Sequence, residues 1–158
     1  DATRGSLADF AARGGKLIIF HGLADTLVAP GQSIAFFDRQ AAEVGGDYRL
    51  AESARLFLAP GMMHCGGGTG PDSFNATLGI PPQPPGYDAE HDLFSALIEW
   101  ADGGDAPNQV IATKFASDDA GRIEMQRPLC AYPRKAEYRG WGSTLSASSF
   151  RCVSPDDR

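Results

Sequence analysis

The sequence predicts an α/β fold, and three observations point to it. Two short runs rich in apolar residues, 16–20 and 55–58, are separated by an amphipathic stretch at 31–44. A second amphipathic stretch begins at Asp88 and continues to about Asp102. Strand, helix, strand, helix in this order is typical of a parallel sheet with right-handed crossovers. We therefore expect a mostly parallel sheet with flanking helices.

The composition fits one soluble globular domain. The chain has 158 residues, of which 42% are hydrophobic and 22% charged, and this length can bury a core of its own. Its 14 basic and 20 acidic residues give a net charge of −6, which disfavours nucleic acid or an anionic membrane as a partner. No apolar run approaches the roughly 20 residues that span a bilayer. The chain begins at Asp1 without a signal-peptide pattern, so we expect a processed chain or a piece of a longer protein.

Glycine and proline mark the ends of elements in the first half of the chain. Gly14-Gly15 and Gly45-Gly46 each follow a helical pattern, and Pro60-Gly61 ends an apolar run. Glycine after a helix and proline after a strand are common stops. Between these stops we predict, in order, a short helix at 7–13, a buried strand at 16–20, a turn at 21–25, a helix at 31–44, a strand at 55–58 and a turn at 60–68.

The second half has a long loop and fewer regular signals. Residues 66–86 contain Gly66-Gly67-Gly68 and a run of prolines, and a loop of this length inside a compact domain is often functional. Asp88 is placed to cap the next helix, which Gly103-Gly104 ends. After the loop we predict a helix from Asp88 to about Asp102, strands at 109–115 and 123–126, and a tail over 127–152 that is rich in turns and aromatic residues.

Asp25 and His64 each lie in the turn that follows a predicted strand. The carboxyl ends of parallel strands gather at one edge of a sheet, and ligand sites form there. Their separation of 39 residues (64 − 25) suits one crossover helix between neighbouring strands. A carboxylate on Nδ1 of His64 would stabilise its imidazolium, and Nε2 could take a proton from a hydroxyl nucleophile. The pattern indicates two members of a Ser-His-Asp triad, although Asp is also a common turn former and a lone His is often a surface residue.

Metal binding is a weaker interpretation of the same region. His21, Cys65 and His91 add metal-type ligands to Asp25 and His64, but their spacing matches no zinc finger or zincin pattern. We therefore expect no metal and no cofactor in this chain. His21 is expected to hydrogen-bond within its turn, and His91 to be an exposed residue at the start of its helix.

Three cysteines are an odd number, so one thiol is left over in an oxidising compartment. Cys130 and Cys152 lie in the same C-terminal region and can pair with each other, which leaves Cys65. Asn75-Ala76-Thr77 is a glycosylation sequon, which fits secretion, although such sequons also arise by chance. We expect a secreted or periplasmic protein.

Several short segments of the chain match the motifs of one enzyme family. They are 14–18 with 21–25 (Gly-Gly-Lys-Leu-Ile and His-Gly-Leu-Ala-Asp), 59–68 (Ala-Pro-Gly-Met-Met-His-Cys-Gly-Gly-Gly), 97–100 with 106–107, 127–133 (Arg-Pro-Leu-Cys-Ala-Tyr-Pro), and 136–140 with 149–152. On these segments the chain resembles, from Leu7 onward, the tannase/feruloyl esterase family of α/β-hydrolases. The resemblance covers nearly the whole chain, and the His-Cys turn and the cysteine-containing tail are its most specific parts.

The resemblance implies roles for individual residues. In that family the catalytic serine follows a cysteine, the catalytic histidine precedes one, and a disulfide joins these two cysteines. By position, Asp25 corresponds to the catalytic acid, His64 to the base, and Cys65 to one half of that disulfide. Cys130 and Cys152 correspond to the structural disulfide of the C-terminal region.

The chain departs from the family pattern in one large respect. The family places the nucleophile, the oxyanion hole and a lid domain before the strand of the acid, and no serine here stands in Gly-x-Ser-x-Gly or Cys-Ser. The resemblance thus implies that residues 1–158 are the C-terminal part of an α/β-hydrolase fold, without its nucleophile half and its lid domain. The implied partner is the N-terminal portion of the same enzyme, with the serine and with a lid that often binds calcium. The implied substrate is a small aromatic acid ester, such as a gallate or a ferulate.

A second interpretation is a non-catalytic piece. A processed subunit or fragment of this kind would only pack against a partner chain. Under either interpretation we expect the isolated chain to lack esterase activity, because an acyl-enzyme requires the serine.

Overall fold

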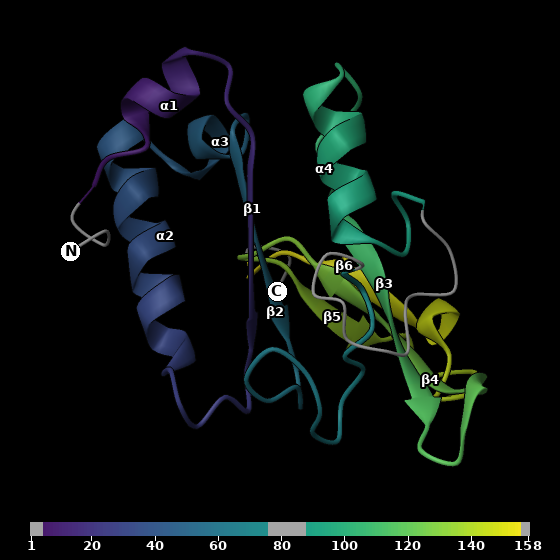
Figure 1. The fold of residues 1–158 in the computed structure, drawn as a ribbon. Helices are drawn as coiled ribbons and strands as arrows, with labels where there is room; N and C mark the ends of the chain where they lie inside the picture. Colours follow the sequence, from purple (N-terminus) through teal and green to yellow (C-terminus); the bar gives the residue numbers. More distant parts are fainter. Residues whose placement is uncertain (1–4, 76–87, 156–158) are drawn as a thin grey trace.

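The computed structural model describes residues 5–75 and 88–155, and its fold is α/β. β1 and β2 run parallel, in register from Leu17 opposite Ala54 to Gly22 opposite Ala59. In Figure 1, α2 and α4 stand on opposite sides of this strand pair. The elements of the first half are α1 (Ala8–Ala12), β1 (Leu17–Gly22), α2 (Pro30–Val44), α3 (Asp47–Leu50) and β2 (Ala54–Ala59).

Both predicted strands and both predicted helices of the first half are present close to their expected bounds. α2 begins with Pro30, whose fixed φ suits the first turn of a helix. Its C-cap is Gly45, whose N–H donates to the carbonyl oxygen of Ala41 and whose left-handed φ of 97° turns the chain so that the Gly46 N–H also donates to this oxygen, at 2.7 Å. The one-turn helix α3 was not predicted, because four residues are too few to show an amphipathic period.

Two clusters of buried side chains fill the space on either side of the β1–β2 pair. The cluster beneath α2 consists of Phe37, Ala41, Leu50, Ala54 and Leu56. The larger cluster joins β2 to α4 (Leu93–Ala101) and to the strands that follow it. Its buried members are Phe57, Ala59, Met62, Phe74, Leu93, Ala96, Val110, Ala112, Leu129 and Ala131.

The helix α4 begins later than predicted. Its N-cap is Asp92, a fully buried residue whose carboxylate accepts a hydrogen bond from the Ser95 N–H at 2.8 Å. Asp88, the expected cap, instead accepts hydrogen bonds from the N–H groups of Glu90 and His91 in the preceding turn. The expectation for Asp88 was therefore wrong, because the amphipathic period starts at Leu93 and the helix is capped immediately before it.

Most strand pairing in the second half is antiparallel. β3 (Gln109–Ala116) and β4 (Asp119–Cys130) form a hairpin, and β5 (Lys135–Tyr138) pairs with β6 (Phe150–Val153) in the same manner. A short 3₁₀ turn at Ala147–Ser149 precedes β6. The expectation of a mostly parallel sheet was therefore wrong for the described residues, since only β1 and β2 pair in parallel there. Strands joined by a tight turn can pair only in the antiparallel sense.

The tail is joined to the rest of the fold by backbone hydrogen bonds and a disulfide. The Tyr132 N–H donates to the carbonyl oxygen of Leu56 at 2.8 Å, so the end of the hairpin lies along the second edge of β2. Cys130 and Cys152 form a disulfide that links β4 to β6. This region contains more strand than its turn-rich sequence indicates. No helix in the described ranges is long and apolar enough to cross a bilayer.

Candidate active site

Asp25 and His64 meet where the two parallel strands end. β1 ends three residues before Asp25, and β2 ends five residues before His64. Nδ1 of His64 donates a hydrogen bond to Oδ2 of Asp25 at 2.8 Å. The side chain of Asp25 is only 4% exposed, whereas that of His64 is 45% exposed. The contact expected from the strand-turn pattern is therefore present, with a buried acid behind an accessible imidazole.

Backbone contacts hold the two turns against each other. The Leu23 N–H donates to the carbonyl oxygen of Ala59, and the Ala24 N–H donates to that of Met62, each at 2.9 Å. Gly22 lies so close to the carbonyl oxygens of Met62 and Met63 that a Cβ atom would collide with both. Glycine at the end of β1 is thus required by the close approach of the turn that carries His64.

The loop around His64 is closed by its own backbone. The Met63 N–H donates to the carbonyl oxygen of Gly67 at 3.2 Å, and the Gly70 N–H donates to that of Gly61 at 3.1 Å. Each of these bonds joins a residue before His64 to a residue after it, so His64 lies in a compact closed loop. Cys65, the next residue, adopts a left-handed φ of 61° within it.

Two charged side chains support this loop from outside. Lys114 on β3 donates to the carbonyl oxygen of Gly68 at 2.7 Å, and the carboxylate of Asp72 accepts from the Gly67 N–H at 2.6 Å. Lys114 and Asp72 also lie 3.9 Å apart as an ion pair. Sequence reasoning missed both residues, because their roles depend on bringing β3 next to the loop.

The environment of Asp25 favours the charged carboxylate. Oδ1 accepts hydrogen bonds from the N–H groups of Leu27 at 2.8 Å and Val28 at 3.0 Å. The pKa of Asp25 is lowered to about 2, first by the Val28 N–H and also by His64 and the Leu27 N–H, although burial opposes the shift. Asp25 therefore remains ionised at neutral pH and can stabilise a positive charge on His64.

A second imidazole lies against the same carboxylate oxygen. Nε2 of His21 is 3.3 Å from Oδ2 of Asp25 and 3.0 Å from the carbonyl oxygen of Val28. Nδ1 of His21 is 2.7 Å from Oγ of Ser33 on α2. His21 does hydrogen-bond close to its own turn, as expected, and it also contacts helix α2, which no local sequence signal connects with it.

The remaining predicted residues make no recorded side-chain contact with this pair. Cys65 is exposed and has no disulfide partner among the described residues. His91 pairs with Asp88 at 2.9 Å in the turn before α4. Within residues 5–75 and 88–155, no three His, Cys, Asp or Glu side chains are grouped so that they could hold a metal ion.

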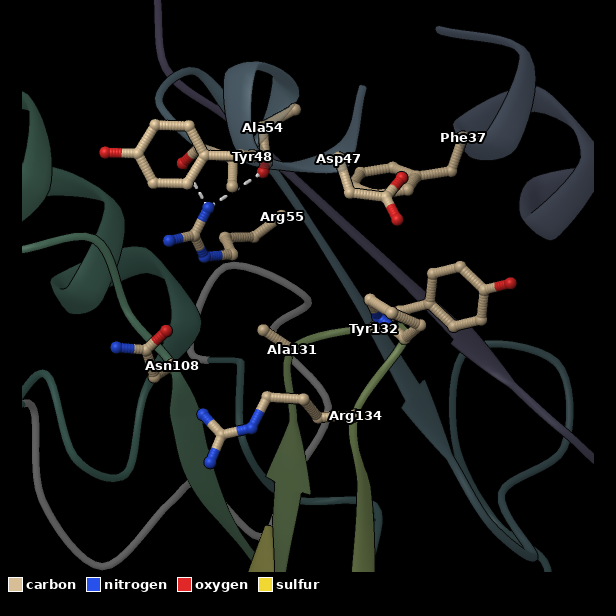
Figure 2. Close-up of a pocket in the computed structure, with 11 residues that line it drawn as sticks. Phe37, Asp47, Tyr48, Ala54, Arg55, Asn108, Ala131, Tyr132 and Arg134 are labelled. Carbon is tan, nitrogen blue, oxygen red and sulfur yellow. Dashed lines mark hydrogen bonds between the residues drawn. The ribbon is translucent and has the colours of Figure 1, made fainter. Parts of the chain in front are cut away.

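A hollow of about 200 Å³ lies at the other end of β2 (Figure 2). Arg55 borders it and donates to the carbonyl oxygens of Ala51, Ala54 and Pro107. These bonds tie α3 to β2 and to the segment before β3, which is a structural role. Neither Asp25 nor His64 lines this hollow, so we do not assign the candidate site to it. Its lining is Phe37, Asp47, Tyr48, Ala51, Ala54, Arg55, Asn108, Ala131, Tyr132, Pro133 and Arg134.

Residues 1–153 match the sequence profile of a family described as tannase and feruloyl esterase. An uncharacterised esterase of Xanthomonas campestris is 37% identical over 97% of this chain, which covers 28% of that relative. A mono(2-hydroxyethyl) terephthalate hydrolase of Piscinibacter sakaiensis is 35% identical over 98% of this chain and 22% of its own length. The chain thus spans less than a third of the length of these relatives.

Solved structures of two esterases are also similar to this chain. Feruloyl esterase B from Aspergillus oryzae superposes with a TM-score of 0.83 at 26% identity, over 95% of this chain and 29% of that one. Another esterase from Aspergillus oryzae superposes with a TM-score of 0.82 at 29% identity, over 94% and 29% of the two chains. The described fold is therefore similar to one segment of these esterases.

Proposed function

The chain belongs to the tannase and feruloyl esterase family, and from this premise we propose that it supplies the acid and the base of a serine carboxylic-ester hydrolase. The observation that carries the proposal is the 2.8 Å hydrogen bond from His64 to the buried Asp25. A carboxylate that holds Nδ1 leaves Nε2 of an exposed histidine available to a nucleophile. We propose further that the chain is the C-terminal part of an α/β-hydrolase fold and that the serine lies in sequence outside it.

The proposed reaction proceeds through an acyl-enzyme. Nε2 of His64 takes the proton of the serine hydroxyl while the serine oxygen attacks the ester carbonyl carbon. His64 then gives this proton to the departing alkoxide, and the acyl group remains on the serine. A water molecule then attacks the acyl carbon as it loses a proton to His64. The bond from the acyl carbon to the serine oxygen breaks, His64 gives the proton to that oxygen, and the acid is released. Asp25 holds the ring and balances the charge of the imidazolium at each stage.

An aromatic acid ester is the substrate class that we propose. The names of the relatives point to feruloyl and terephthalate esters, which are aromatic. Apolar side chains are also exposed on the same turns as Asp25 and His64, and exposed apolar patches commonly mark ligand sites. These side chains are Leu23, Leu27, Val28 and Met63.

The proposed partner is the remainder of the same enzyme, docked on the open side of β1. Within the described residues, β1 pairs with β2 along one edge only, and five of its six residues are half-buried. An unpaired strand edge readily accepts another strand. Next to it, Phe94 and Ile98 of α4 are exposed large apolar residues. This surface supports the partner proposal, and the non-catalytic alternative would use the same surface without contributing to the reaction.

A secreted or periplasmic location is part of the proposal. The disulfide between Cys130 and Cys152 supports it, because disulfides persist in oxidising compartments. The sequon at Asn75 has its last two residues outside the described ranges, so the structure does not bear on it.

The test uses the enzyme expressed from its complete reading frame, with a chromogenic aryl ester as substrate. His64→Ala and Asp25→Asn should each lower kcat by roughly 10⁴-fold, as losses of single triad members do. His64→Ala should retain the fold, as measured by thermal melting, because the His64 side chain is 45% exposed.

His91→Ala is the matched control, since His91 also bonds to a carboxylate at 2.9 Å but lies in another turn. It should leave kcat nearly unchanged. Unchanged hydrolysis in His64→Ala would refute the proposal. If a fluorophosphonate probe labels no serine anywhere in the enzyme, the non-catalytic alternative would be favoured instead.

A further inference from the structure

We infer that His21 is a positioning residue for Asp25, and that Ser33 selects the ring tautomer on which this positioning depends. The inference rests on the proposed function, in which Asp25 is the acid. It concerns a chain of contacts that runs from Ser33 on α2 through His21 and Asp25 to His64.

The partners of His21 determine where its proton lies. Nε2 faces the carbonyl oxygen of Val28 at 3.0 Å and Oδ2 of Asp25 at 3.3 Å. A carbonyl and a carboxylate can only accept hydrogen bonds, so Nε2 must carry a proton. A neutral ring then has its lone pair on Nδ1.

Ser33 is placed to recognise that lone pair. Its Oγ lies 2.7 Å from Nδ1 of His21, and a hydroxyl group can donate to it. The opposite tautomer would put an unprotonated Nε2 against two acceptors. Ser33 therefore favours the tautomer in which the Nε2–H of His21 faces the Val28 carbonyl oxygen and the Asp25 carboxylate, and it connects the start of α2 with the site.

The burial of the three side chains shows which contact anchors the acid. The His21 side chain is 10% exposed and that of Asp25 is 4% exposed, while His64 is 45% exposed. Oδ2 of Asp25 is thus held from the inside by His21 and approached from the accessible side by His64. Without the His21 ring, Oδ2 keeps only the more exposed partner, His64, among the described contacts, and the Val28 carbonyl oxygen loses its side-chain donor.

The first experiment reads the ring tautomers by nitrogen NMR of the complete enzyme labelled with ¹⁵N-histidine. At neutral pH, His21 should show a proton on Nε2 alone and His64 a proton on Nδ1. His21→Ala should reduce the Nδ1–H signal of His64, and Ser33→Ala should mix the tautomers of His21. A His21 ring protonated on Nδ1, alone or together with Nε2, would overturn the inference.

The second experiment separates positioning from general stability. His21→Ala should lower kcat by roughly 10- to 100-fold, as small displacements of catalytic groups do, with KM nearly unchanged. His21→Gln should restore part of the loss, because its amide N–H₂ can donate from near the position of Nε2. His91→Ala, which removes a histidine from a different carboxylate, should change neither kcat nor the signal of His64.

The two proposals fail in different ways. If His64→Ala abolishes hydrolysis but His21→Ala changes neither kcat nor the His64 signal, the positioning role is wrong and the proposed function stands. If the tautomers are as inferred but His64→Ala leaves hydrolysis intact, the proposed function is wrong and the contact chain is structural.

Discussion

Gly22, the last residue of β1, lies directly against the carbonyl oxygen of Met62, two residues before His64. The same carbonyl accepts a hydrogen bond from the Ala24 N–H, next to Asp25. The acid and the base are therefore joined by a backbone contact as well as by their side chains. This contact sets how closely the two turns approach.

The close approach predicts a large effect from a small substitution. Gly22→Ala should destabilise the fold by roughly 1–3 kcal/mol, the usual cost of overpacking, and should displace the turn of His64 and lower activity. Gly31→Ala is the control, since a Cβ atom there meets nothing within 4 Å. It should be neutral or stabilising by about 0.4–1 kcal/mol, because it restricts the unfolded chain. Urea unfolding gives the free energy of unfolding of each variant. Equal free energies for Gly22→Ala and Gly31→Ala would contradict the prediction.

The disulfide should account for much of the stability of the C-terminal region. Cys130 and Cys152 are 22 residues apart, and closing such a loop stabilises by about 3 kcal/mol in the chain-entropy description. Replacing both cysteines with serine should lower the free energy of unfolding by about this amount. In the isolated chain, where Cys65 is an exposed free thiol, Cys65→Ser should change it little. The expectation fails if reduction of the disulfide leaves the unfolding midpoint unchanged.

Asp25 should make stability depend on pH in the acid range. Its pKa is lowered from 3.8 to about 2, so the folded protein releases this proton at lower pH than the unfolded chain. The resulting stabilisation is complete above about pH 4 and is lost as the pH falls through about 2. The melting temperatures of the wild type and of Asp25→Asn should therefore converge as the pH falls from about 4 to about 2. A constant difference between the two curves would show that Asp25 has no part in the acid dependence.

Cys65 should be a free thiol in the isolated chain, and this chain should not hydrolyse esters. Thiol titration of the unfolded, unreduced chain should find one sulfhydryl, since the other two cysteines are joined. A chromogenic aryl ester should be turned over no faster than by the His64→Ala variant. Turnover that depends on His64, together with fluorophosphonate labelling of a serine in this chain, would show that the nucleophile is present here.

The contact between Asp25 and His64 could be predicted because it depends on strong local signals. Each residue follows a short apolar run closed by a turn, and parallel strands bring such turns to one edge. The helix at Pro30–Val44 was equally clear, with proline at its start and glycine after its end. The pairing of Cys130 with Cys152 needed only their placement in one region and the family resemblance.

The missed features depend on residues that are distant in sequence. Ser33 could not be connected with His21, nor Lys114 with Gly68, before the packing of α2 and β3 was known. The β5–β6 strands lie in a segment whose glycines and serines resemble a loop, and pairing and the disulfide override this weak propensity. Local patterns thus predicted the contact between Asp25 and His64. The residues that support this pair could be found only once the fold was known.

The register of β1 against β2 has a consequence for how this segment tolerates insertions. The ends of both strands are fixed opposite each other, Gly22 beside Ala59, so the connection between them does not set the distance from acid to base. Extra residues at Gly45-Gly46, where α2 ends, would lengthen the crossover at a small entropic cost and leave the two turns in place. A shift of β1 by one residue would be far more damaging, because it would reverse the face of every side chain on the strand.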